Sequence, residues 1–229
     1  PWYVDDPLVK HLEEVQFTEG IADMSFRMPV QYVIRPLSNE LHDYRGYAGT
    51  IESGHIEVGQ QIAVMPSGVN TIITHIERPN GTVRSAAESD AVTIRIAGDI
   101  DISRGDMFSN PNEKPNVDNH FEATVCWMTD KTSLKAGVMV RIKHTTHTVR
   151  ALILGVEFKV DVNDLSRQLV GDELVINEIG QVSMKTTEPL IFDEYVDNRA
   201  TGSFILIDAA TNETVGAGMI GRPVCFAAV

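Results

Sequence analysis

Two histidines, His144 and His147, are the first residues in this sequence whose type and spacing could bind a metal ion. Imidazole is a common metal ligand. On one strand, however, residues three apart point to opposite faces, and neither a cysteine nor a carboxylate nearby completes a ligand set. We therefore expect no metal site at this pair.

Asp99 and Asp101 are spaced as a carboxylate pair that could serve general acid–base catalysis. Two residues apart, they would share one face of a strand. Because they directly precede the run Arg104-Gly105-Asp106, a solvated strand edge explains them better than an active site does. For that run we expect a tight turn with an internal ion pair.

A phosphate-binding loop of the Gly-x-x-x-x-Gly-Lys-Ser/Thr type is absent from the sequence. Such a loop surrounds the phosphates of a nucleotide with backbone N–H groups and a lysine. The nearest spacing, Gly216 to Gly221, is followed by Arg222 and Pro223 and is typical of a strand end. Since no nucleophile–base pair is visible either, we expect no catalytic, cofactor-binding or metal-binding residue in this chain.

Composition narrows the class of protein. The 229 residues are 43% hydrophobic and 22% charged, which is typical of a soluble globular protein, and the length suffices for one large or two ordinary domains. There are 32 acidic and 19 basic side chains, a net charge of −13. This charge argues against a general nucleic-acid binder, because phosphate neutralisation needs a surplus of lysine and arginine.

Cysteine usage and apolar runs predict a cytoplasmic protein without a membrane segment. No apolar run reaches the roughly 18 residues of a membrane-spanning helix. The two cysteines, Cys126 and Cys225, give neither a disulfide framework nor a metal-binding spacing, as expected in a reducing compartment. Both lie in apolar, strand-like runs, and we expect both to be buried.

The elements that would position these residues are one short helix followed by β-strands. Leu8, Val9, Leu12 and Val15 recur at helical spacing. From Phe26 onward, short β-type runs alternate with turns, which is typical of barrels or sandwiches. The expected strands lie at residues 30–34, 47–51, 61–65, 71–76, 91–96, 121–127, 138–143, 148–160, 173–176, 180–184, 203–207 and 214–218.

A loop rich in proline and asparagine, residues 109–116, divides these strands into two groups of similar size. Such a composition is typical of a domain linker. In the second group, one short helical turn is expected at residues 163–169. Phe121 and Trp127 lie at even spacing on one strand and should fill the core of this group. The chain is therefore predicted to be all-β, in two units.

Several separated motifs resemble known proteins, in the same order along the chain. The run Arg45-Gly-Tyr-Ala-Gly-Thr-Ile-Glu-Ser-Gly-His-Ile-Glu-Val-Gly59 resembles the second-domain barrel of the translation-factor GTPases. Residues 99–106 and 189–220 resemble the large, GTP-binding subunit of bacterial sulfate adenylyltransferase. So do Pro1-Trp2-Tyr3 and His11-Leu12-Glu13, which correspond to the last helix of that subunit's GTPase domain.

The resemblance implies two consecutive barrels of the elongation factor Tu domain 2 and domain 3 types, preceded by a short helix. Residues 20–113 would form the first barrel and residues 114–229 the second. Residues 1–19 would be a remnant helix of the GTPase domain, and we expect that domain to have been cut away just upstream.

In this family the large subunit binds and hydrolyses GTP, while a small subunit makes adenylyl sulfate and pyrophosphate from ATP and sulfate. The resemblance implies that this chain is the non-catalytic C-terminal portion of the large subunit. GTP and Mg²⁺ would bind in the absent N-terminal domain, and the partners would be that GTPase domain and the small catalytic subunit. The alternative is an elongation-factor-like module that binds an aminoacylated RNA end, which the acidity disfavours.

Four residues are candidates for a partner interface. Arg45, Tyr47 and Arg104 lie beside turns that a partner domain could reach. Asn198 lies, with Asp193 and Arg199, in the loop before the last expected hairpin. This loop could form a partner surface, or it could be held by internal hydrogen bonds.

Overall fold

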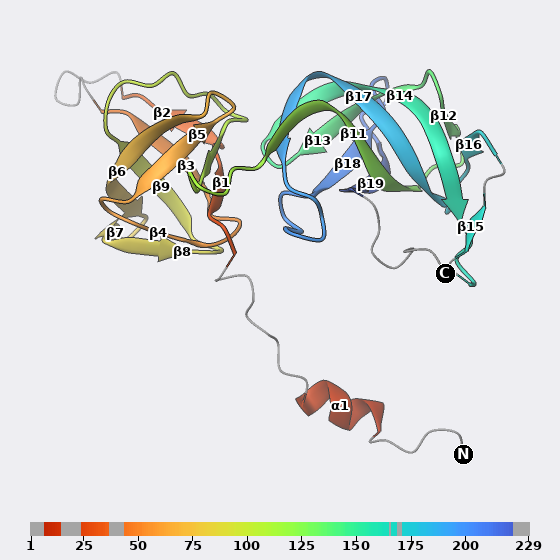
Figure 1. Cartoon of the computed structure of the whole chain (residues 1–229), viewed down its shortest axis with the longest axis horizontal. Coiled ribbons are helices and arrows are strands. Elements are labelled where there is room, and N and C mark those ends of the chain that lie inside the picture. Colours follow the sequence, from red (N-terminus) through yellow and green to blue (C-terminus); the bar gives the residue numbers. More distant parts are fainter. Residues whose placement is uncertain (1–6, 15–23, 37–43, 165, 169–170, 222–229) are drawn as a thin grey trace.

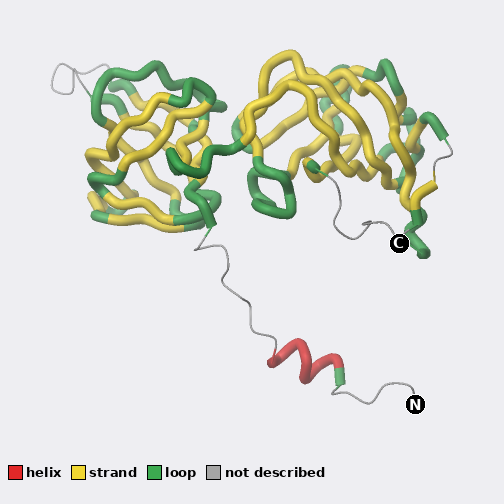
Figure 2. The backbone as a smooth tube through the Cα atoms, viewed as in Figure 1, coloured by secondary structure: helices red, strands yellow, loops and turns green. Residues whose placement is uncertain are grey.

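The computed structural model describes residues 7–14, 24–36, 44–164, 166–168 and 171–221. Apart from the short helix α1 (Leu8–Glu14), these residues form strands and loops in two barrel-like bodies (Figures 1 and 2). The all-β prediction and the short first helix are confirmed. In the described part of the chain, no helix has the length and apolarity needed to cross a membrane.

The first barrel is built from antiparallel strands in the order β1-β10-β5-β6-β9-β3-β2, with β7 paired to β6 and a small β4–β8 sheet beside them. These strands are β1 (Arg27–Pro29), β2 (Tyr32–Ile34), β3 (Gly46–Thr50), β4 (His55–Glu57), β5 (Gln61–Met65), β6 (Val69–Arg78), β7 (Gly81–Val83), β8 (Ser85–Ala87), β9 (Ala91–Ile96) and β10 (Met107–Ser109). Isoleucine and valine side chains fill the interior, together with Tyr47 and Phe108, whose rings meet edge to face with centroids 5.6 Å apart. Alternating burial along each strand thus produces one apolar core.

A glycine allows β1 and β3 to approach each other. A Cβ atom on Gly49 would lie 2.4 Å from the carbonyl oxygen of Pro29, closer than any real contact. Beside it, the backbone N–H of Gln31 donates to the carbonyl of Ala48 at 2.9 Å. The glycine pattern of residues 45–59 therefore reflects close backbone packing, as the sequence predicts.

The second barrel is a closed ring. Its sheet runs β13-β18-β19-β11-β17-β14-β15, and β13 also pairs with β14, so the first and sixth of these strands meet. The strands are β11 (Asn116–Trp127), β13 (Met139–His144), β14 (His147–Val160), β15 (Arg167–Gln168), β17 (Ile179–Phe192), β18 (Ser203–Ile207) and β19 (Thr214–Ile220), and β12 (Leu134–Lys135) pairs with β16 (Glu173–Leu174). Phe121 and Trp127 are buried in this core, as predicted.

Two local predictions are wrong. Of the helical turn expected at residues 163–169, Asn163 and Asp164 do lie in a turn, but Arg167 and Gln168 form β15 and pair with the end of β14, and residues 165 and 169 lie outside the described part of the chain. Cys126 is half-buried, because it alternates with the inward-facing Val125 and Trp127 and so lies on the outer side of β11. Cys225 lies outside the described residues.

Candidate functional site at the junction of the two barrels

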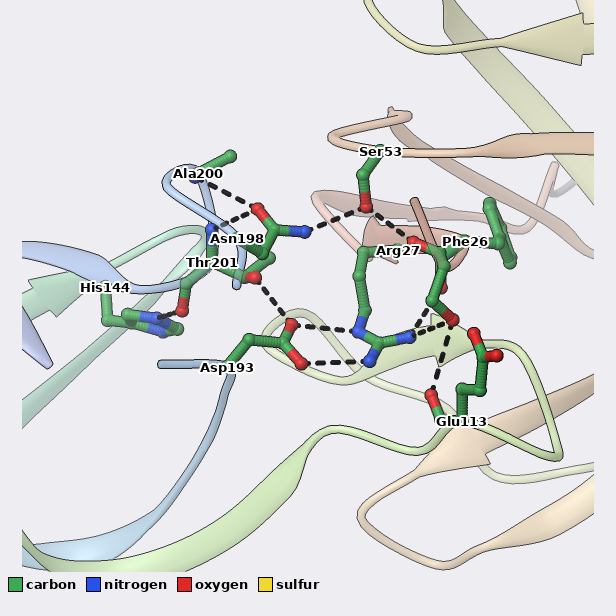
Figure 3. A network of polar contacts seen from close by, with 10 residues as sticks. Phe26, Arg27, Ser53, Glu113, His144, Asp193, Asn198, Ala200 and Thr201 are labelled. Atoms are coloured by element: carbon green, nitrogen blue, oxygen red, sulfur yellow. Dashed lines mark hydrogen bonds and ion pairs between the residues drawn. The ribbon is translucent and has the colours of Figure 1, made fainter. Parts of the chain in front are cut away.

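The contact between the barrels is centred on one arginine–carboxylate pair (Figure 3). Arg27 of β1 donates from Nε and Nη2 to the two carboxylate oxygens of Asp193, each at 2.9 Å. The side chains are only 5% and 13% exposed. The third nitrogen of Arg27, Nη1, donates to the Ser25 hydroxyl at 3.0 Å and to the Phe26 carbonyl at 2.9 Å. The buried guanidinium is therefore satisfied on all three nitrogens.

Asp193 also links this pair to the interior of the second barrel. The Thr201 hydroxyl donates to Asp193 Oδ2 at 2.6 Å. The carbonyl of Thr201 accepts a hydrogen bond from Nε2 of His144 at 2.7 Å. Because a carbonyl can only accept, Nε2 of His144 carries the proton. Burial lowers the pKa of His144, against the hydrogen bond to Thr201, which raises it. The imidazole is therefore neutral at neutral pH.

A second polar link across the junction is made by Asn198. Its amide nitrogen donates to the Ser53 hydroxyl of the first barrel at 2.9 Å, and that hydroxyl donates to the carbonyl of Ser25 at 2.7 Å. The amide oxygen of Asn198 accepts from the backbone N–H groups of Ala200 and Thr201 at 3.1 and 3.2 Å. The loop is thus held by internal hydrogen bonds, one of the two alternatives that the sequence left open. Its asparagine is 6% exposed.

A third contact joins the turn before β10 to the β13–β14 hairpin. Arg104 donates from Nε to the carbonyl of Thr146 at 3.1 Å and from Nη1 to that of Gln31 at 3.2 Å. A Cβ atom on Gly105, whose φ is +101°, would lie 3.3 Å from the His147 ring. The tight turn is confirmed, but its expected internal ion pair is not among the ion pairs of the described residues. The guanidinium of Arg104 reaches the second barrel instead.

Apolar packing lies beside these polar contacts. Met65 of β5, Met107 of β10 and Ile191 of β17 form a small cluster of their own, each at most 7% exposed. Two members come from the first barrel and one from the second. The junction therefore combines a desolvated ion pair, hydrogen bonds and buried apolar surface, the combination found in stable interfaces.

The two histidines lie on the same side of their hairpin, contrary to the prediction. His144 and His147 are directly paired across the two-residue turn between β13 and β14, and cross-strand partners share a face. His144 is buried, whereas Nε2 of His147 lies 3.4 Å from a carboxylate oxygen of Glu188. Within the described residues, no group of three or more histidine, cysteine, aspartate or glutamate side chains could hold a metal ion.

The four predicted interface residues are placed in different surroundings. Tyr47 is 1% exposed in the first core, and its hydroxyl donates to the carbonyl of Ile100 at 3.3 Å. Arg45 pairs with Asp99, whose side chain is 83% exposed, so the solvated edge expected at Asp99 is what the structure shows there. As described above, Arg104 and Asn198 lie at the junction of the barrels. Contact of these four residues with another protein stays a prediction.

Sequence reasoning did not single out Arg27 or Ser53. The usable signal was a charged residue between Phe26 and Met28 in an apolar run, because an arginine inside such a strand needs a buried partner. Ser53 is fully buried but lies in an ordinary turn sequence, and nothing in its neighbourhood distinguishes it. Within the described residues, the polar side chains of this arrangement donate to and accept from one another across the junction. What it can do is hold two barrels in one orientation.

Comparison with known proteins agrees with this architecture. Residues 47–109 match the family model described as elongation factor Tu domain 2, and residues 120–221 match the model described as GTP-eEF1A C-terminal domain-like. Among solved structures, sup35 in complex with GDP has a TM-score of 0.78 at 20% identity, covering 97% of this chain and 53% of that one. Apo elongation factor SelB from Methanococcus maripaludis has a TM-score of 0.70 at 19% identity, covering 95% and 47%. At these identities the likeness shows the fold alone.

Sequence relatives are more specific. The bifunctional enzyme CysN/CysC of Mycobacterium tuberculosis is 48% identical over 98% of this chain, which spans 36% of that protein. Sulfate adenylyltransferase subunit 1 of Psychromonas ingrahamii is 41% identical over 97% of this chain, which spans 46% of it. The chain thus spans less than half the length of these relatives. Over nearly its whole length the chain therefore resembles sulfate adenylyltransferase subunit 1, and its fold is that of two consecutive barrels of the translation-factor type.

Proposed function

We propose that this chain is the non-catalytic barrel portion of a sulfate adenylyltransferase subunit that couples GTP hydrolysis to the formation of adenylyl sulfate from ATP and sulfate. The observation that carries the proposal is the 48% identity to a CysN/CysC protein across 98% of the chain. GTP and Mg²⁺ would bind in a GTPase domain outside these 229 residues. The two barrels, residues 20–113 and 114–229, would change position when the GTPase domain changes conformation. The protein would act in the cytoplasm.

The role we assign to the barrels is to act as one rigid unit. Coupling between a GTPase domain and a partner needs an element that moves as a whole between two states. The bidentate Arg27–Asp193 pair and the Asn198–Ser53 hydrogen bond join the two barrels. Both contacts are buried, so water does not readily replace either of them. A movement imposed on one barrel would therefore be passed to the other.

The partner of this unit would be the small catalytic subunit of the enzyme. Arg45 and Arg104 carry charge at the surface of the first barrel, and we propose them as contacts for that subunit or for the GTPase domain. Tyr47 and Asn198 would act from the interior, by holding the segments that carry such contacts.

The first experiment measures binding of the 229-residue chain to the small subunit of the same organism by titration calorimetry. Saturable binding, weakened by Arg104→Gln but not by Arg150→Gln on the outer face of the second barrel, supports the proposal. Saturable GTP or ATP turnover by the chain alone would overturn its non-catalytic assignment. Tight binding of an aminoacylated RNA end would favour the elongation-factor-like alternative.

The rigid-unit role is tested in the full-length subunit that contains the GTPase domain. Asp193→Asn keeps the shape of the side chain and removes its charge. We expect GTP hydrolysis to persist while adenylyl sulfate formed per GTP falls. An unchanged ratio in a folded variant would show that the junction has no part in coupling.

A further inference from the structure

Three arginines line one hollow on the first barrel, away from the junction. The hollow has a volume of about 320 Å³. Its lining residues belong to β9 or lie close in sequence to the ends of β2, β3 and β9, and these three strands are neighbours in the first barrel, in the order β2-β3-β9. Arg35 follows β2, Arg45 precedes β3 and Arg95 belongs to β9. The remaining lining residues are Pro36, Tyr44, Ile96, Gly98 and Asp99. In a chain with 32 acidic and 19 basic side chains, three cations around one concavity form a strong local exception.

Two of the arginines are held in place by contacts on the protein side. The guanidinium carbon of Arg95 lies 5.1 Å from the ring centroid of Tyr44, a cation–π distance. The Tyr44 hydroxyl donates to Glu77 at 2.9 Å, which fixes the ring. Arg45 donates to the carbonyl of Ile100 at 3.2 Å. Because these contacts already order the two arginine side chains, less side-chain entropy is lost when a ligand binds.

Only one carboxylate among the described lining residues opposes these cations. Asp99 accepts a hydrogen bond from Arg45, but its side chain is 83% exposed. An ion pair this solvated contributes little, and a stronger anion can displace it. Asp99 therefore pairs with the guanidinium of Arg45 only as long as no stronger anion enters the hollow.

We propose that this hollow binds the oxyanion group of a small phosphate- or sulfate-bearing molecule. Guanidinium groups present paired N–H donors that match the oxygens of such groups, and the cations among the described lining residues are all arginines. The volume lies near the lower end of the usual range for small-molecule sites, roughly 300 Å³. A long polyanion such as nucleic acid would also meet the acidic remainder of the surface, which favours a compact anion.

This inference shares only Arg45 with the contacts proposed above, and its test uses small anions without a partner protein, so either proposal can fail without the other. The test titrates inorganic pyrophosphate and, separately, inorganic sulfate into the 229-residue chain and follows the arginine Nε–H signals by NMR. We expect saturable shifts at Arg35, Arg45 and Arg95, with a dissociation constant of about 0.1–1 mM for the better anion. The two titrations distinguish a phosphate site from a sulfate site.

Variants separate this site from general attraction to positive charge. Arg95→Gln should weaken pyrophosphate binding at least about fivefold, because a charge-assisted contact is lost. Arg150→Gln removes an exposed arginine of the second barrel and should leave pyrophosphate binding unchanged. Asp99→Asn should tighten binding about threefold by removing the competing carboxylate. This last variant keeps every arginine, so it tests the site even if Arg95→Gln fails to fold.

Three outcomes would overturn the inference. The first is the absence of saturable binding of either anion. The second is an equal loss of affinity in Arg95→Gln and Arg150→Gln. The third is binding of a single-stranded oligonucleotide where neither small anion binds, which would mark the hollow as part of a nucleic-acid surface.

Discussion

Two arginine–aspartate pairs in this molecule consist of the same chemical groups but differ in their role. Arg27 and Asp193 meet at the junction of the barrels with side chains 5% and 13% exposed, whereas Arg45 and Asp99 meet at the mouth of a hollow with side chains 28% and 83% exposed. The first pair is bidentate, and the third guanidinium nitrogen of Arg27 donates to Ser25 and to Phe26. In the second pair, water can readily replace the contact between Arg45 and Asp99. Burial, more than residue type, decides whether such a pair holds a structure together or leaves charge available.

The stability lost on removing one residue of a pair depends on how well the remaining charge is solvated. At the junction, the remaining charge stays buried without a counter-ion, which is costly. At the hollow, the remaining charge is hydrated at once, so little is lost. The two pairs therefore give a direct internal comparison.

The largest effect is expected for Asp193→Ala. Removal of this carboxylate leaves the guanidinium of Arg27 buried and unpaired, and should lower the free energy of unfolding by about 3–5 kcal/mol. Urea unfolding followed by tryptophan fluorescence measures it. Asp197→Ala, an exposed aspartate in the same loop, is the matched control and should change little. A loss of less than about 1 kcal/mol in Asp193→Ala would mean that the two pairs are energetically alike.

The second effect concerns Asn198→Ala at the same junction. The substitution removes the hydrogen bond to Ser53 and leaves the buried N–H of Thr201 without its acceptor. We expect a loss of about 1–3 kcal/mol. In the double variant with Asp193→Ala, the two losses should not add, because both break one connected network. Strict additivity would show that the ion pair and the amide act independently.

A third effect appears on acidification. Burial lowers the pKa of His144 below its ordinary value of 6.5, so the unfolded chain binds more protons than the folded chain once the pH falls through that value. Stability from this group is therefore present above pH 6.5 and declines below it, by at most about 1.4 kcal/mol at pH 5.5. Comparison of urea unfolding near pH 7.5 and pH 5.5 checks this. His144→Gln should lose less stability than the wild type over this range, and an equal loss would contradict the assignment.

The smallest effect is expected at the exposed pair. Asp99→Ala should change the free energy of unfolding by less than about 0.5 kcal/mol, because the pair is solvated and screened by salt. The same urea experiment in low and high salt measures the change. A loss as large as that of Asp193→Ala would remove the contrast between the two pairs and would indicate that the hollow is a structural site.

Several features of the fold could be predicted from local sequence. Period-two alternation located most strands, and the glycine pattern around Gly49 indicated close backbone packing that the structure places against Pro29. The failures were also local. Pairing of Arg167 and Gln168 with β14 overrides the helical pattern of that stretch. The turn between His144 and His147 places both histidines on one face, which a spacing rule for a continuous strand cannot anticipate.

The sequence by itself determined the all-β class, the division into two groups of strands and the resemblance to sulfate adenylyltransferase subunit 1, because each depends on short patterns or on motif order. Only the tertiary structure decided which polar residues join the barrels and which surround the hollow. Arg27 and Asp193 are 166 residues apart, and Asn198 and Ser53 are 145 apart. Such partners meet only when both barrels have folded and docked, and the burial that makes the first pair strong arises in that same step.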